Sequence, residues 1–177
     1  LIYYSDDEGE SWELSEQMIM GPLMSRSGMQ EPGVVELEDG RVLLWARTDL
    51  GTQYQCISLD EGMTWSKPSQ SDFIGPLSPV SIKRNPRTRA LIAIHNDHSG
   101  QYPCRKNWRA PLAILVSRDD SQTWQPLVLI EKSKIGWFCY SSMLFTASGL
   151  YLSYVAGNKR MGLLSRMKVV FISNTEL

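Results

Sequence analysis

Short apolar runs, separated by turn residues, occupy most of this 177-residue chain. Their lengths and their content of Val, Ile, Leu and aromatic residues are typical of β-strands. No stretch keeps apolar side chains at positions i, i+3 and i+4 for three turns, so the pattern predicts little helix. The strands that we expect cover residues 31–37, 41–47, 54–58, 71–75, 79–84, 90–96, 110–117, 126–131, 140–146, 149–155 and 166–173.

One eight-residue pattern recurs between these strands and is called the Asp box below. It reads SDDEGESW at 5–12, SLDEGMTW at 58–65 and SRDDSQTW at 117–124. The Asp can accept backbone N–H bonds inside a tight turn, and the Gly, replaced by Ser121 in the third box, can take a positive φ. The first serines of the boxes lie 53 and 59 residues apart. Self-similarity at this spacing indicates a propeller or another repeat array.

Each repeat contains four antiparallel strands, a to d, with the Asp box at the c–d turn. Four-stranded units around a central channel are the blades of a β-propeller. We therefore expect an all-β chain that holds strands c and d of one blade, two complete blades, and strands a, b and c of another. Residues 1–177 are then one partial propeller domain of about three blades. Because three blades do not close a ring, we expect the N-terminal remainder of the propeller as a partner, and self-association through the uncovered blade faces.

Composition excludes few classes of binding partner. Eighteen basic and nineteen acidic residues give a formal net charge of −1, which provides no reason to expect a nucleic acid or an anionic membrane surface. No apolar run approaches the roughly 18 residues of a membrane span. The chain opens at Leu1 on a strand without an initiator Met, so we expect a piece of a longer protein, and the compartment stays open.

Cysteine and histidine give no reason to expect a metal or a cofactor. Cys56, Cys104 and Cys139 are odd in number and lack zinc-ligand spacing, so we interpret them as mostly buried thiols. His95 and His98 flank Asn96-Asp97 without a clear third ligand, and we interpret them as polar loop residues.

Antiparallel strand order sorts the remaining polar residues by face. If strand a begins at the top of a blade, the b–c loops also lie at the top and the Asp boxes lie at the bottom. Glu31 and Tyr140 begin a strands, Arg47 ends a b strand and Arg109 precedes a c strand, so we expect all four at one rim of the channel. Two arginines can bind a substrate carboxylate through charge-assisted hydrogen bonds. A phenol, with an ordinary pKa of about 10, needs an adjacent base to become a nucleophile.

The sequence at this rim resembles the sialidase (neuraminidase) family with its Asp-box repeats. The segments that carry the resemblance are MQEPGVVELEDGRVLLWART (29–48), RAPLAILVS (109–117) and WFCYSSMLF (137–145). Their order and blade positions match, and the resemblance covers essentially the whole chain. It implies a propeller of six blades when complete, and an exo-glycosidase that removes terminal sialic acid with retention of configuration.

The resemblance also implies a role for each of the four residues. Tyr140 would be the nucleophile and Glu31 the base that takes its proton, while Arg47 and Arg109 would hold the substrate carboxylate. The family's acid/base aspartate and the first of its three arginines have no match here. We expect both in the missing N-terminal blades, and little turnover by the isolated chain.

Two other functions stay open. A glycosidase can keep the acidic-sugar site and act on another acidic sugar, because fold does not fix function. A non-catalytic glycan-binding propeller would lack part of the catalytic machinery. An Arg and an Asp on early top loops would favour the enzyme, and their absence from the full-length protein would favour the binding module.

Overall fold

The computed structural model describes residues 1–15 and 17–177. That part of the chain is all β, with no helix long and apolar enough to cross a membrane. Its thirteen strands are β1 (Tyr3–Tyr4), β2 (Glu13–Leu14), β3 (Gln30–Glu36), β4 (Val42–Arg47), β5 (Thr52–Ser58), β6 (Ser69–Ile74), β7 (Ser81–Arg84), β8 (Leu91–Asn96), β9 (Leu112–Ser117), β10 (Gln125–Glu131), β11 (Trp137–Phe145), β12 (Gly149–Gly157) and β13 (Met167–Ser173).

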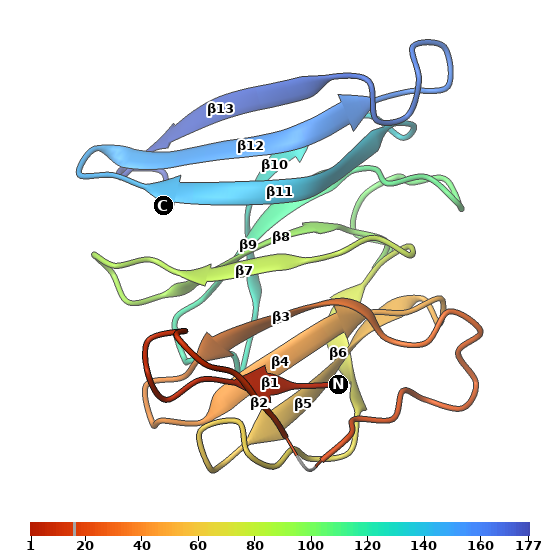
Figure 1. The fold of residues 1–177 in the computed structure, drawn as a ribbon. Helices are drawn as coiled ribbons and strands as arrows, with labels where there is room; N and C mark the ends of the chain where they lie inside the picture. Colours follow the sequence, from red (N-terminus) through yellow and green to blue (C-terminus); the bar gives the residue numbers. More distant parts are fainter. Residues whose placement is uncertain (16) are drawn as a thin grey trace.

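The strands form four antiparallel sheets in which neighbours in sequence are neighbours in space. β1 pairs with β2, β3 to β6 form one four-stranded sheet, β7 to β10 form another, and β11 to β13 form a three-stranded sheet. The three larger sheets are stacked, with β3, β7 and β11 side by side, and β7 contacts both β3 and β11 (Figure 1). This is the blade arrangement of a β-propeller, and it confirms the expected c–d pair, two complete blades and a final a–b–c set.

The core lies between the stacked sheets, and strand β8 supplies two parts of it. All six residues of β8 are buried. Leu91 and Ala93 pack toward the β3–β6 sheet, whereas Ile92 and Ile94 pack toward the β11–β13 sheet. A strand buried on both faces reads as a continuous apolar run, which explains the sequence ALIAIHN (90–96).

The three Asp boxes form the same hydrogen-bonded turn. In the first box, Asp7 accepts the backbone N–H and the hydroxyl of Ser11 at 2.9 and 2.6 Å, and the Ser5 hydroxyl accepts the N–H of Gly9 at 2.8 Å. The hydrogen bond from the Ser11 hydroxyl is the main reason that the pKa of Asp7 falls to about 2. In the third box Ser121 adopts the positive φ, 73°, of the glycine that it replaces. The Asp-box carboxylates therefore stabilise the turns between strands.

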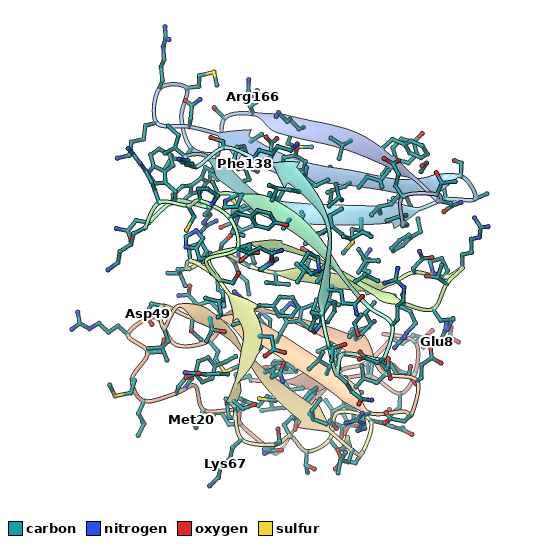
Figure 2. The ribbon with its side chains drawn as sticks, turned by 180° about the vertical axis from the view of Figure 1, so that it is seen from behind. Glu8, Met20, Asp49, Lys67, Phe138 and Arg166 are labelled. Carbon is teal, nitrogen blue, oxygen red and sulfur yellow. The ribbon has the colours of Figure 1, made fainter. Side chains whose placement is uncertain are left out.

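The boxes lie at the opposite end of the strands from the b–c loops. Figure 2 labels Glu8, from the first box, at one end and Asp49, from the β4–β5 loop, at the other. Five predicted strand starts were wrong by two or three residues. Strands β5, β6 and β7 begin at Thr52, Ser69 and Ser81 rather than at 54, 71 and 79. Strand β11 begins at Trp137 rather than at 140, and β9 begins at Leu112 rather than at 110, directly after Pro111, which has no N–H for the ladder.

Candidate active site

Four polar residues from three sheets or their loops meet at the b–c end of the channel. The Tyr140 hydroxyl, on β11, donates to Oε1 of Glu31, on β3, at 3.4 Å. Nη2 of Arg47, the last residue of β4, lies 3.1 Å from the same Oε1 atom. The phenol–carboxylate distance is long for an O–H···O bond, as is common in active sites without a ligand. One carboxylate oxygen therefore contacts both the phenol and a guanidinium.

Backbone hydrogen bonds to β11 and to the residue before it hold Arg109 at this cluster. Its N–H donates to Gly136 O at 3.1 Å, and its carbonyl accepts the N–H of Phe138 at 2.9 Å. The guanidinium carbon then lies 4.7 Å from the Trp137 ring centroid and 5.3 Å from that of Tyr140. Burial by itself would lower the pKa of Arg109, but hydrogen bonding with Tyr140 and Cys139 raises it above the ordinary value. Arg109 is thus a fixed positive charge against the Tyr140 ring.

Both arginines keep donors that no described residue satisfies. Nε and Nη1 of Arg47, and the same two atoms of Arg109, are buried and have no hydrogen-bond partner within residues 1–15 and 17–177. Buried charged donors are normally paired, because leaving them unpaired costs free energy. The Arg109 residue is only 8% exposed and the Arg47 side chain 12%. An anionic group, such as a carboxylate, is the ligand that would satisfy these donors.

The backbone at Glu31 and at Tyr140 has the same unusual conformation. Their φ angles are 50° and 55°, in the left-handed region that non-glycine residues avoid at a cost of about 1–2 kcal/mol. The β3–β4 register shifts between Gln30 and Gly33, and the β11–β12 register shifts beside Tyr140. Such bulges redirect a side chain and often lie next to active sites. The sequence pattern gives no sign of the bulge at Tyr140, whereas Pro32-Gly33 is a signal for the one at Glu31.

Two hollows border this cluster. One, of about 490 Å³, lies among β3, β7 and β11 and is lined by Glu31, Tyr140 and Lys83 among others. The second, of about 560 Å³, lies among the b–c loops and is lined by Arg109 and Lys106 among others. Lys83, whose Nζ donates to Met143 O at 3.1 Å, and Lys106 are site residues that the sequence analysis did not single out. The second hollow has room for a ligand whose anionic group lies at Arg109.

The histidines and cysteines contribute little to the cluster. His95 is a buried residue of β8, so its interpretation as a loop residue was wrong, and burial lowers its pKa to about 4. His98 lies in the b–c loop, with Nε2 3.0 Å from Ala110 O. Within the described residues, no group of three or more His, Cys, Asp or Glu side chains could hold a metal ion. Cys56 and Cys139 are buried and Cys104 is half-buried.

Comparison with known proteins places the chain in a family. The model of the BNR repeat-like domain matches residues 1–152. The chain belongs to this family. A sialidase of Micromonospora viridifaciens is 29% identical to it over 157 residues, which cover 84% of this chain and 22% of that protein. The BNR repeat-like domain described here thus spans about a fifth of the length of that relative.

Solved sialidase structures share the fold of this BNR repeat-like domain. The intramolecular trans-sialidase of Ruminococcus gnavus, in complex with oseltamivir carboxylate, matches 99% of this chain over 38% of its own, with 19% identity and a TM-score of 0.70. The Trypanosoma rangeli sialidase in complex with 2,3-difluorosialic acid, a covalent intermediate, matches 94% over 26% of its own chain, with 19% identity and a TM-score of 0.69. At these identities the likeness shows the sialidase β-propeller fold. The roles of Glu31, Arg47, Arg109 and Tyr140 stay predictions.

Proposed function

We propose that this domain carries part of the active site of a sialidase-like exo-glycosidase that removes a terminal sialic acid with retention. The observation that carries the proposal is the Tyr140–Glu31 pair, 3.4 Å apart, beside two arginines with unsatisfied buried donors. Arg47 and Arg109 bind the carboxylate of the terminal sugar. This orientation presents the anomeric carbon to the Tyr140 oxygen.

The chemical step proceeds in two displacements. Glu31 takes the phenolic proton as the Tyr140 oxygen bonds to the anomeric carbon, and the bond from that carbon to the leaving oxygen breaks. Water then displaces the tyrosine oxygen and gives a proton to the group that had protonated the leaving oxygen. The tyrosine oxygen regains its proton from Glu31, and the free sugar keeps its original configuration. The covalent intermediate of the Trypanosoma rangeli sialidase supports this route. Sialidases with a tyrosine nucleophile are an exception among glycosidases, most of which use two carboxylates.

The charges around Tyr140 favour a phenol over a carboxylate as the nucleophile. A carboxylate would be repelled by the carboxylate of the substrate, whereas a phenol is neutral until its proton leaves. Arg109, whose guanidinium carbon lies 5.3 Å from the Tyr140 ring centroid, provides a positive charge next to the oxygen as negative charge develops on it. Under this proposal, residues 1–177 form a partial propeller domain. The acid for the leaving group and a third arginine belong to its N-terminal remainder.

The test is hydrolysis of a fluorogenic sialoside by the longer protein that contains residues 1–177. Tyr140→Phe should lower kcat by about 10²–10⁴-fold, a range typical of lost proton-transfer or nucleophilic groups, with little change in sialic acid binding. Tyr151→Phe is the matched control, because Tyr151 lies on β12 outside the cluster. Full activity of Tyr140→Phe would refute the proposal. Binding of sialosides by the wild type without turnover would favour the glycan-binding alternative, and turnover of a different acidic sugar would change the substrate.

A further inference from the structure

The end of the molecule that holds the candidate site also carries an excess of positive charge. Residues 98–118 and 132–175 contain no aspartate or glutamate. The β8–β9, β10–β11 and β12–β13 loops of these stretches leave the sheets at the same end, at the right in Figure 1. Besides Arg109, they carry seven basic residues, called the basic rim below: Arg105, Lys106, Lys132, Lys134, Lys159, Arg160 and Arg166.

The acidic residues that balance this charge gather at the opposite end of the strands. The first Asp box, with Glu8 at the right of Figure 2, contains four acidic residues, and the second and third boxes contain two each. The protein therefore has a formal net charge of only −1 while its two ends differ strongly in sign. Such a field attracts anions to one end and repels them from the other.

The cations of the basic rim are exposed and largely unpaired. All seven residues are exposed, and none forms an ion pair with any residue that the structure describes. Basic residues elsewhere do pair: Lys168 with Glu131, and Arg84 with Asp120. Asp97, at the start of the β8–β9 loop, is buried and accepts the N–H of Ser99 at 2.7 Å. The rim charge is thus available to a ligand.

The basic rim is joined to the candidate site by direct contacts. Lys159 Nζ lies 5.4 Å from the Trp108 ring centroid, which links the β12–β13 loop to the β8–β9 loop. Trp108 directly precedes Arg109. Lys106 and Arg109 line the same hollow of about 560 Å³. Asp49, on that hollow as well, is engaged by the Ser25 hydroxyl at 2.6 Å.

We propose that the basic rim binds a second anionic group of the glycan whose terminal carboxylate lies at Arg47 and Arg109. The substrate class is then a glycan with two acidic groups near its end, the second being a carboxylate or a sulfate. This inference rests on the proposed function, because it takes the arginine site as the anchor for the first carboxylate. The hollow shared by Arg109 and Lys106 leads from the first anion to the second.

Binding of three defined glycans by the Tyr140→Phe variant of the longer protein tests the proposal, because the wild type would hydrolyse the probes during a titration. The probes are sialyllactose, a sialic acid dimer and a sialyllactose sulfated on galactose, each titrated by calorimetry at about 20 mM and about 200 mM salt. The two dianionic probes should bind about 5- to 10-fold more tightly than sialyllactose at low salt, and salt should remove most of that preference, because exposed charges are screened. The dimer and the sulfated probe distinguish a carboxylate from a sulfate as the second anion.

Charge-reversal variants test whether residues of the basic rim cause the preference for dianionic glycans. Arg105→Glu with Arg160→Glu, in the same Tyr140→Phe background, should abolish the preference and leave sialyllactose binding within about twofold, since surface pairs are weak and local. Arg87→Glu with Arg118→Glu makes the same net charge change at exposed positions of the Asp-box end and should keep the preference. Equal effects of the two double variants would overturn the proposal in favour of a net-charge effect. Equal affinity of the Tyr140→Phe protein for all three glycans would overturn it as well. A preference for dianionic probes without sialoside turnover by the wild type would refute the proposed hydrolysis and leave the rim inference standing.

Discussion

The left-handed backbone at Glu31 gives a prediction about stability that does not depend on any substrate. Glu31→Ala and Glu31→Gly both remove the carboxylate that contacts Tyr140 and Arg47. The two variants therefore differ only in what the backbone at this position tolerates. We predict that Glu31→Gly is the more stable of the two.

The magnitude follows from two opposing terms. At a φ of 50°, alanine costs about 1–2 kcal/mol that glycine does not. Glycine loses more backbone entropy on folding, which costs about 0.5–1 kcal/mol relative to alanine. The difference makes Glu31→Gly more stable than Glu31→Ala by about 0–1.5 kcal/mol, with a central value of about 0.7 kcal/mol.

Urea unfolding of both variants measures this difference, and Val34 supplies the control. Val34 lies on the same strand, is 59% exposed and pairs in regular register with Leu44. There, Val34→Gly should be less stable than Val34→Ala by about 0.5–1 kcal/mol, the usual order. The midpoints should shift without a change in the m-value. If Glu31→Gly is also less stable than Glu31→Ala, the backbone at Glu31 is not under the strain that we infer.

Three further predictions concern the turns, the core and the outer face. The Thr123 hydroxyl is the main reason that the pKa of Asp119 falls to about 2, below an unfolded value of about 4. The contribution of the ionised Asp119 carboxylate to folding stability is present above pH 4 and is lost as pH falls through 2. Asp119→Asn should therefore be less stable than the wild type at pH 7, and its stability should change less between pH 4 and pH 2. Gly33→Ala puts a methyl group into the Trp45 ring, and should lower stability by about 1–3 kcal/mol and shift tryptophan emission. Val169→Glu, on the exposed apolar face of β13, should reduce self-association in sedimentation experiments.

Each of these has a matched control elsewhere in the protein. Asp72→Asn changes an exposed carboxyl of β6, and should leave acid sensitivity as it is. Gly40→Ala has no atom within 4 Å of the added carbon but has a φ of 82°, so it should lower stability through backbone strain and leave Trp45 emission unchanged. Emission is therefore the measurement that separates Gly33→Ala from this control. Val128→Glu, on β10, should not alter self-association. An identical response of a variant and its control would contradict the corresponding prediction.

Features that depend on near neighbours in the chain were readable from the sequence. Each Asp box closes its turn with hydrogen bonds over two to four residues, such as Ser58 to Asp60 and Thr64 to Asp60. The box spacing and the apolar runs between boxes therefore predicted the blades and their strand order. Strand order alone then placed Glu31, Arg47, Arg109 and Tyr140 at one end of the channel.

The detailed geometry of the site was decided only by tertiary structure. The contact of Arg109 with the β11 backbone, the 3.4 Å approach of Tyr140 to Glu31 across 109 positions, and the contact of Lys159 with Trp108 all join distant parts of the chain. The positive φ angles at Glu31 and Tyr140 likewise occur where their strands shift register against a neighbour. A local pattern encodes the preference of a residue for a strand or a turn. It does not encode which blade packs beside it, and that packing sets where the charged groups meet.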